Sequence, residues 1–281
     1  MQVSHATAQT RFVERDGARF AYRRWGNAAS GKPPLFLLQH FRGGMDHWDP
    51  LMTDGLAAGR EVILYDPRGC ASSTGTPRAL IEDMADDAAQ VIRALGLAQV
   101  DVLGFSLGGM IAQDLTLRHP GLVRRLMLLG TQPRGGNPDP HPRIFKVAPN
   151  PVPTADDFLF LFFDPSEAAK EAGRAFWTRR HQRPDLDPPS SAELMMGQIA
   201  ANTAFVTPLD PDAPFAHLQK ITQATLIVNG VNDVMIATIN SWHLVQNIPN
   251  AQLIVYPDAG HGAQFQYPDK FLKHAVQFVD E

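Results

Sequence analysis

Short apolar runs alternate with amphipathic segments along the first and last thirds of the chain. Four apolar runs in the first half have the length and composition of buried strands, at 34–38, 61–65, 99–103 and 126–129. Apolar residues recur at three- and four-residue spacing from Met84 to Leu95 and stop before Gly96, which predicts an amphipathic helix with a glycine C-cap. The alternation returns near the C-terminus, where we expect strands at 225–229 and 251–256 and helices at 236–248 and 268–279. Such alternation predicts a mostly parallel sheet with helices on both faces.

The middle third of the chain breaks this alternation. Seven prolines fall between Pro133 and Pro153, too many for regular elements, and they predict an ordered but irregular loop. Two helices are expected after the loop, each starting at an N-cap residue with a glutamate three residues later: 164–180 from Asp164 and Glu167, and 190–202 from Ser190 and Glu193. This region is therefore expected to be inserted into a domain formed by the chain on either side of it.

These patterns divide the chain into a core and an insertion. We expect an α/β core at 1–130 and 216–281, with residues 131–215 forming a mostly helical cap. The core should begin with an antiparallel hairpin, because residues 11–14 and 19–23 alternate in polarity around a turn at Asp16-Gly17. A length of 281 residues suits one large domain with such an insertion.

Composition and charge argue against several classes of protein. The chain is 44% hydrophobic with a net charge of -4, which disfavours nucleic acid or an anionic membrane as its main partner. Its single cysteine, Cys70, can form neither an intramolecular disulfide nor a cysteine-based zinc site. The first ten residues are polar, and no run approaches the roughly 18 apolar residues of a membrane span. We therefore expect a soluble, cytoplasmic protein.

The segment Gly104-Phe105-Ser106-Leu107-Gly108 joins an expected strand to an expected helix. The helix is predicted at 107–119, because that segment has helical spacing and ends before Pro120. Small residues on both sides of Ser106 let the backbone bend sharply, so that the hydroxyl stands clear of the strand end. The helix N-terminus offers free N–H groups and positive potential at the same point. The pattern predicts a serine nucleophile, with an ordinary glycine-rich turn as the alternative.

A serine nucleophile needs a base, and the base needs an acid that orients it. His261 is the candidate base, because it follows the last expected strand in a glycine-flanked loop that can lean over the sheet edge. Its alternative role is to stabilise that loop. Asp233 directly follows an expected strand, which places it at the same sheet edge as Ser106 and makes it the candidate acid. Asp258 lies closer to His261 in sequence but is typical of a turn.

An acyl-transfer site also needs two N–H donors for the oxyanion. The backbone N–H of Leu107 is one candidate, since it immediately follows the nucleophile. The second donor is expected from the loop at 39–44 that follows an early strand, where the backbone N–H of Phe41 is our choice.

Five short motifs occur along the chain: Asp66-Pro67-Arg68-Gly69, Gly104-Phe105-Ser106-Leu107-Gly108-Gly109-Met110, Arg118-His119-Pro120, Gly230-Val231-Asn232-Asp233 and Gly260-His261. With these motifs the chain resembles the α/β-hydrolase family over nearly its whole length. The most similar branch holds 3-oxoadipate enol-lactonases, small-ester hydrolases and cofactor-free haloperoxidases with perhydrolase activity. The resemblance implies the α/β-hydrolase fold and no metal or organic cofactor. It also implies a triad and two oxyanion donors at these positions: Ser106, Asp233 and His261, with Phe41 and Leu107.

Two positions depart from the family pattern. His40 stands where the oxyanion loop of the family usually has a glycine, so the path of the loop at 39–44 is less constrained by the resemblance. Ala71 stands where a second glycine is expected after Asp66-Pro67-Arg68-Gly69. Neither departure touches the three triad positions.

Eight further side chains are candidates for the wall of a substrate pocket: His40, Arg42, Phe105, Phe145, Trp177, Phe205, Val234 and Met235. For the apolar ones the alternative is ordinary core packing. His40 would either contact the substrate or hold its own loop by a hydrogen bond. Arg42 would either bind a substrate carboxylate or remain exposed on the loop.

The sequence thus predicts a serine hydrolase that cleaves a small carboxylic ester or lactone through an acyl-enzyme, with water as the second substrate. Perhydrolysis, in which peroxide replaces water, and carbon–carbon bond hydrolysis use the same triad and stay open. Dehalogenase and epoxide hydrolase chemistry is disfavoured, because those relatives have aspartate at the elbow. A non-catalytic ligand-binding protein is the alternative from another class, although binding alone does not require all three triad residues. The oligomeric state is not indicated.

Overall fold

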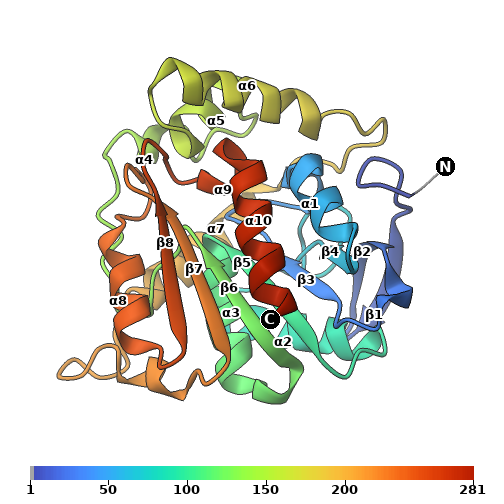
Figure 1. Cartoon of the computed structure of the whole chain (residues 1–281), viewed down its shortest axis with the longest axis horizontal. Helices are drawn as coiled ribbons and strands as arrows, with labels where there is room; N and C mark the ends of the chain where they lie inside the picture. The colour runs from blue at the N-terminus through green and yellow to red at the C-terminus, as the bar shows by residue number, and fades with distance from the viewer. Residues whose placement is uncertain (1–2) are drawn as a thin grey trace.

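The structure is a computed structural model that describes residues 3–281, and its centre is an eight-stranded sheet (Figure 1). The strands lie in the order β1-β2-β4-β3-β5-β6-β7-β8. β1 pairs antiparallel with β2, and β2 with β4, whereas the other neighbours are parallel. The mostly parallel sheet and the N-terminal hairpin are therefore confirmed. The strand bounds are Arg11–Arg15 (β1), Ala18–Gly26 (β2), Leu35–Leu38 (β3), Glu61–Tyr65 (β4), Val100–Phe105 (β5), Val123–Leu129 (β6), Ala224–Gly230 (β7) and Ala251–Tyr256 (β8).

Helices cover both faces of the sheet, as the alternating pattern predicts (Figure 1). Along β3, Leu35 and Leu37 join the core under α1 and α10, while Phe36 and Leu38 join the core under α2, α3 and α8. Successive strand residues point to opposite faces, so a strand with all four residues buried implies a covered sheet. The helix bounds are Pro50–Ala57 (α1), Ile81–Ala94 (α2), Leu107–Arg118 (α3), Ile144–Val147 (α4), Ala155–Phe162 (α5), Glu167–Arg180 (α6), Ala192–Phe205 (α7), Ile239–Asn247 (α8), Ala263–Gln266 (α9) and Pro268–Asp280 (α10).

The chain between β6 and β7, residues 130–223, leaves the sheet and returns to it; we refer to it as the β6–β7 segment. Its helices α5 and α6 lie above the sheet, beyond the carboxyl ends of the central strands (Figure 1). Its last helix, α7, packs back on the core beside α2: a Cβ added at Gly197 would lie 2.9 Å from the carbonyl oxygen of Arg78. A separate cap with bounds at 131 and 215 stays a prediction.

Two helices of the β6–β7 segment begin later than their sequence signals indicate. The N-cap of α6 is Ser166, whose hydroxyl accepts a hydrogen bond from the backbone N–H of Ala169, and not Asp164. Likewise, Ser191 caps α7, and not Ser190. In both cases a second polar residue lies beside the expected cap, and only its position relative to the first helical turn decides between them.

The start of α8 and four helices, α1, α4, α5 and α9, were not anticipated. α8 begins at Ile239 and not at 236, because the carboxylate of Asp233 accepts hydrogen bonds from the two N–H groups at 235 and 236. This side chain competes with a helical turn for the same donors. Two of these helices, α1 and α5, have N-caps, Asp49 and Thr154, that each accept a backbone hydrogen bond. Both caps were visible in the sequence as start signals.

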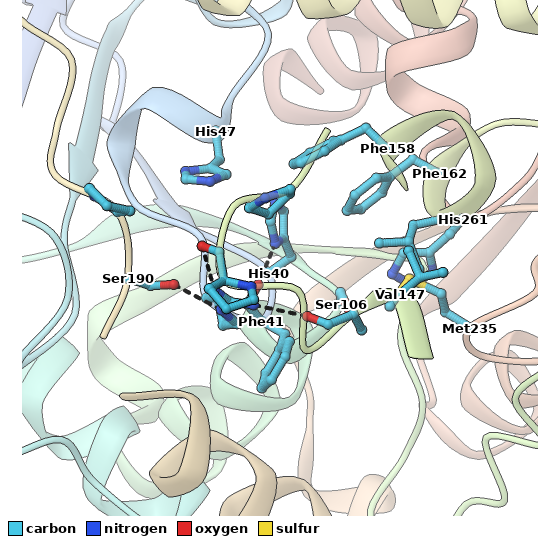
Figure 2. A pocket seen from close by; sticks show the side chains of 16 residues that line it. His40, Phe41, His47, Ser106, Val147, Phe158, Phe162, Ser190, Met235 and His261 are labelled. Carbon is cyan, nitrogen blue, oxygen red and sulfur yellow. Dashed lines mark hydrogen bonds between the residues drawn. The ribbon is translucent and has the colours of Figure 1, made fainter. Parts of the chain in front are cut away.

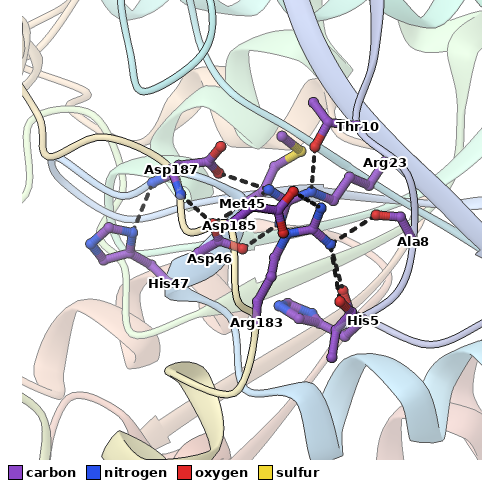
Figure 3. A network of polar contacts seen from close by, with 12 residues as sticks. His5, Ala8, Thr10, Arg23, Met45, Asp46, His47, Arg183, Asp185 and Asp187 are labelled. Carbon is purple, nitrogen blue, oxygen red and sulfur yellow. Dashed lines mark hydrogen bonds and ion pairs between the residues drawn. The ribbon is translucent and has the colours of Figure 1, made fainter.

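The link between α6 and α7, residues 181–191, is held by a buried polar network; we refer to it as the strap (Figure 3). Arg23 of β2 pairs with Asp46 and, at 3.2 Å, with Asp187 of the strap. The backbone N–H of Asp187 donates to Asp46 at 2.7 Å. Arg183 donates to backbone carbonyls near the N-terminus of the chain. The strap is thus fixed by side chains and carbonyls that lie far away in sequence.

Candidate active site

Ser106 occupies a sharp bend between β5 and α3. Its backbone angles are φ 57° and ψ −118°, in a region that non-glycine residues rarely adopt. The bend leaves no room for side chains beside it: a Cβ at Gly104 would lie 2.3 Å from the carbonyl oxygen of Gly108, and a Cβ at Gly108 would lie 2.0 Å from that of Leu38. Strain of this kind costs about 1–3 kcal/mol and persists where the surroundings enforce it. The glycines of the motif are therefore a steric requirement of the bend.

His261 and Asp233 form a buried hydrogen-bonded pair at the same edge of the sheet. Nδ1 of His261 lies 2.7 Å from Oδ2 of Asp233, and both side chains are fully buried. The other carboxylate oxygen of Asp233 accepts from two backbone N–H groups, which fixes its orientation. Since an ionised carboxylate only accepts hydrogen bonds, Nδ1 carries the proton and Nε2 carries a lone pair. Nε2 is buried without a hydrogen-bond partner among residues 3–281.

The rival acid, Asp258, lies elsewhere. It has a positive φ of 53° in the turn after β8, and its side chain is exposed. Its backbone carbonyl, rather than its carboxylate, accepts a hydrogen bond from Gln266. Ser106 and His261, in contrast, line the same cavity and lie close together (Figure 2). The structure thus gathers Ser106, His261 and Asp233 and leaves Asp258 in a turn.

In the loop after β3, the backbone N–H of Phe41 has no hydrogen-bond acceptor among residues 3–281. His40 donates its N–H to Oε1 of Gln39, and Arg42 donates to Oε1 of Gln198. The next two residues of the loop also donate, to His40 O and to Nδ1 of His47. The N–H of Phe41 has no acceptor within residues 3–281, and neither has the N–H of Leu107 at the first position of α3. These are the two donors expected from the sequence.

His40 holds the loop and also reaches the cavity. Its Nδ1 lies 2.7 Å from the carbonyl oxygen of Phe41, and its ring packs against the rings of Phe105 and Phe162. Burial lowers the pKa of His40 to about 3, so the ring is neutral at physiological pH. Of the two roles considered for His40, the structural one is therefore present, together with a place in the cavity wall.

Arg42 is buried, which corrects the expectation of an exposed loop arginine. Its Nε donates to the hydroxyl of Ser190 at 2.8 Å, and its Nη1 donates to the carbonyl oxygens of Ala148 and Asn150 at 2.9 and 2.8 Å. The guanidinium therefore clamps the proline-rich loop and the strap onto the loop after β3. The carbonyls and the hydroxyl use the donors that a substrate carboxylate would need.

Two spaces meet at Ser106. The inner chamber, of about 80 Å³, is lined by His40, His47, Ser106, Phe158, Phe162 and His261, among others (Figure 2). The outer groove, of about 710 Å³, is lined by Leu107, Met110, Phe145, Ile199 and Val206, among others. Four residues line both spaces: Phe41, Ser106, Ala148 and Met235. Ser106 therefore stands at the junction of a small space and a large one.

The predicted pocket residues divide between lining and support. Met235 lines both spaces, Phe145 lines the outer groove, and His40 and Arg42 line the inner chamber. Four others line neither space, which corrects their assignment: Phe105, Trp177, Phe205 and Val234. The ring of Phe105 instead backs the ring of His261, with centroids 5.0 Å apart, and Trp177 packs behind Phe158. Phe205 lies under the guanidinium of Arg134.

Sequence reasoning missed several residues of the inner chamber, among them Phe158, Phe162 and His47. Phe158 and Phe162 come from α5, the helix whose capping box Thr154–Asp157 was not used as a signal. His47 lies in the short turn after the loop, and burial holds its pKa well below the usual range. In the part of the chain from residue 3 onward, no three His, Cys, Asp or Glu side chains gather as a metal site would require. Over the same residues, no helix is long and apolar enough to cross a bilayer.

Comparison with known proteins gives the family of this chain. The sequence family described as alpha/beta hydrolase fold matches residues 33–268. The solved structure of an alpha/beta hydrolase fold protein from Chitinophaga pinensis is 36% identical, with a TM-score of 0.91, and the match covers 99% of this chain and 100% of that one. A Caulobacter vibrioides protein named "Putative carbamate hydrolase RutD" is 30% identical over 92% of this chain and 94% of its own length. A 2-hydroxy-6-oxo-6-phenylhexa-2,4-dienoate hydrolase from Burkholderia cepacia is 28% identical over 84% of this chain and 83% of its own. The chain therefore belongs to the α/β-hydrolase family and is a hydrolase of that fold.

Proposed function

We propose that the protein is a serine hydrolase that cleaves a small carboxylic ester or lactone through an acyl-enzyme. One observation carries the proposal: a strained serine and the unpaired Nε2 of a carboxylate-oriented histidine line the same small cavity. Ser106 is the nucleophile, His261 the base and Asp233 the acid that orients it. The free N–H groups of Phe41 and Leu107 support their assignment as oxyanion donors.

In the first half of the reaction, Nε2 of His261 takes the proton of the Ser106 hydroxyl as Oγ attacks the substrate carbonyl carbon. The electron pair of the C=O bond moves onto oxygen, and the two N–H donors stabilise that negative charge, each by about 3–4 kcal/mol. The C=O bond then re-forms as the bond to the leaving oxygen breaks. That oxygen takes the proton from Nε2 and departs as an alcohol, leaving an ester on Ser106.

Water completes the cycle by the same steps. Nε2 of His261 removes a proton from water as the water oxygen attacks the acyl carbon. When the intermediate collapses, Oγ of Ser106 leaves and recovers the proton, and the carboxylic acid is released. Asp233 stays ionised throughout and stabilises the imidazolium that forms in each half.

Carbon–carbon bond hydrolysis is the second candidate, because the Burkholderia relative is named for a hydrolase of a dienoate substrate. Carbamate hydrolysis has similar support from the Caulobacter relative. Perhydrolysis would need only that peroxide replace water in the second half. These reactions use the same three residues, so a panel of esters, lactones, carbamates and a dienoate, assayed with and without peroxide, separates them. A non-catalytic ligand-binding protein would turn over none of these substrates.

A fluorophosphonate probe tests the nucleophile. The probe should label Ser106, and Ser106→Ala should lose both the labelling and all measurable turnover. Ser190→Ala is the matched control, because Ser190 lines the same chamber but its hydroxyl accepts a hydrogen bond from Arg42. Ser190→Ala should still be labelled at the same peptide, as mass spectrometry would show. Labelling of the Ser106→Ala variant, or turnover by it, would refute the assignment.

A further inference from the structure

The two spaces that meet at Ser106 differ in size and in chemistry. The inner chamber has about 80 Å³, and its lining includes aromatic rings and three histidines. The outer groove has about 710 Å³, and none of the residues that line it is charged. An ester has an acyl side and an alcohol side, and the two spaces can receive them in either of two orientations.

The position of His261 decides this question. The histidine that removes the serine proton must return it to the leaving oxygen, so the leaving group has to lie within hydrogen-bond reach of Nε2. His261 lines the inner chamber and does not line the outer groove. The leaving group must therefore enter the inner chamber.

The oxyanion donor on the other side of Ser106 points to the same arrangement. Leu107, which supplies one of the two free N–H groups, lines the outer groove and not the inner chamber. The tetrahedral carbon carries Oγ, the oxyanion, the leaving atom and the acyl chain. With the leaving atom on the side of His261, the acyl chain is directed into the groove that begins beside Leu107.

Resting on the hydrolase function proposed above, we propose that this enzyme acts on esters of an uncharged, extended apolar acid with a very small alcohol. The acyl chain lies in the outer groove against Phe145, Ile199 and Val206, and the small leaving group occupies the inner chamber. The chamber has about one-ninth of the volume of the groove, so it suits the smaller end of the ester, a short alcohol such as methanol.

The charges around the site agree with an uncharged acid. Among residues 3–281, Arg42 is the one arginine on the chamber wall, and its guanidinium donates to Ser190 and to three carbonyls of the proline-rich loop. Burial keeps His40 and His47 neutral, so neither supplies a positive charge to a substrate carboxylate. A carboxylate on the acyl chain would meet no cation among the described residues that line the groove.

A pair of mirror esters tests the orientation directly. Methyl octanoate and heptyl acetate have the same atomic composition, but one has the long chain on the acid and the other has it on the alcohol. We expect kcat/KM to favour methyl octanoate by at least about 100-fold, since each methylene that a pocket cannot accept costs about 10-fold or more. Equal values, or a preference for heptyl acetate, would overturn the assignment of the two spaces.

Two variants of α7 locate the acyl chain. Ile199→Trp narrows the outer groove and should lower kcat/KM for methyl octanoate about 10-fold while leaving methyl acetate within about twofold. Met196→Trp is the matched control, because Met196 is exposed on the same helix and does not line the groove. It should change neither substrate. A loss for both substrates in Ile199→Trp would mean that the groove does not hold the acyl chain.

The failure of this inference can be told apart from the failure of the proposed function. If the fluorophosphonate probe labels Ser106 but heptyl acetate is preferred, only the orientation is wrong. If the probe does not label Ser106, the hydrolase mechanism itself falls, and the orientation with it. Should neither ester be turned over by a protein that is labelled, a crystal structure of the octylphosphonate adduct of Ser106 decides. The octyl chain should lie along Ile199, and a chain in the inner chamber would refute the assignment.

Discussion

The core and the β6–β7 segment hold their parts of the site by different means. In the core, backbone geometry decides: the glycines beside Ser106 have carbonyl oxygens 2.0–2.3 Å from where a Cβ would be, and Asp233 is fixed by two backbone N–H groups. In the β6–β7 segment, long side chains decide: Arg42, Arg183 and the Arg23–Asp46 pair reach across to hold loops that have little regular structure. Backbone contacts thus fix the positions of Ser106 and Asp233, whereas side-chain hydrogen bonds and ion pairs hold the walls of the two spaces.

The largest expected effect comes from the carboxylate that orients the base. Asp233→Asn should lower kcat by about 10⁴-fold, because an amide that donates to Nδ1 selects the wrong imidazole tautomer. Asp258→Asn should change kcat less than about twofold, since that side chain is exposed in a turn. Steady-state kinetics on one ester, with circular dichroism to confirm folding, provide the measurement. If Asp258→Asn lost more kcat than Asp233→Asn, Asp258 and not Asp233 would be the acid that orients the base.

A pair of glycines compares the two regions by stability. Gly108→Ala places a Cβ 2.0 Å from a backbone carbonyl that cannot move without shifting β3, so the free energy of unfolding should fall by more than about 4 kcal/mol. Gly173→Ala in α6 meets the flexible end of Leu159 at 2.3 Å and gains helix propensity, so its net loss should stay below about 2 kcal/mol. Urea unfolding measures both. Equal losses of unfolding free energy would show that the β6–β7 segment accommodates an added methyl group no better than the core does.

The backbone donor in the loop after β3 can be separated from its side chain. Phe41→Pro removes the N–H and should lower kcat by about 10²-fold or more in protein that still folds. Phe41→Ala keeps the N–H and should retain turnover within about 10-fold, with an altered preference among esters because both spaces lose a wall. Wild-type kcat in folded Phe41→Pro would place the second donor elsewhere.

Acid should destabilise the folded protein, because two buried histidines resist protonation. Burial lowers the pKa of His5 to about 4 and that of His40 to about 3, against about 6.5 for a solvated imidazole. The unfolded chain therefore binds protons below about pH 6.5 that the folded chain does not take up until pH 3–4, so stability falls as the pH falls through this window. Through His5 alone, the free energy of unfolding should fall by about 3 kcal/mol as the pH falls through this window.

Thermal unfolding between pH 7 and pH 4 measures this loss. His5→Gln should flatten the dependence of Tm on pH, although it also removes the hydrogen bond between His5 and Thr53. His181→Gln, at an exposed position after α6, should leave the slope unchanged. A slope that is identical in wild type and His5→Gln would show that this buried ring is not the cause.

The smallest effect is expected at Arg42, which joins the loop after β3 to the proline-rich loop and the strap. Arg42→Lys keeps the charge but loses the planar fork that reaches Ser190, Ala148 and Asn150 together, so KM should rise about fivefold with kcat within about threefold. Arg174→Lys is the control, at an exposed position on α6. A fall in kcat alone would mean that Arg42 acts on the oxyanion loop rather than on the walls.

The same division explains what the sequence could predict. The sheet, the elbow and the placing of Asp233 and His261 at one edge follow from patterns that span fewer than about 20 residues, which a single sequence displays. The role of Arg42 does not, because its partners lie 106, 108 and 148 residues away. Phe158 and Phe162 of α5 were missed because the capping box that starts this helix lies among prolines, which were interpreted as an irregular loop. Phe105 and Trp177 are apolar like wall residues, and only packing shows that they lie behind the wall.

The strap anchors also have a consequence for the order of folding. Arg183 meets the carbonyl of Ala8 across 175 residues of sequence, so this contact closes one of the longest loops in the molecule. Contacts of such separation cost the most chain entropy and form late. The sheet can assemble from neighbouring strands while residues 3–8 and the strap are still free. The inner chamber, whose wall includes residues of the strap, is then completed only when the two ends of that loop meet.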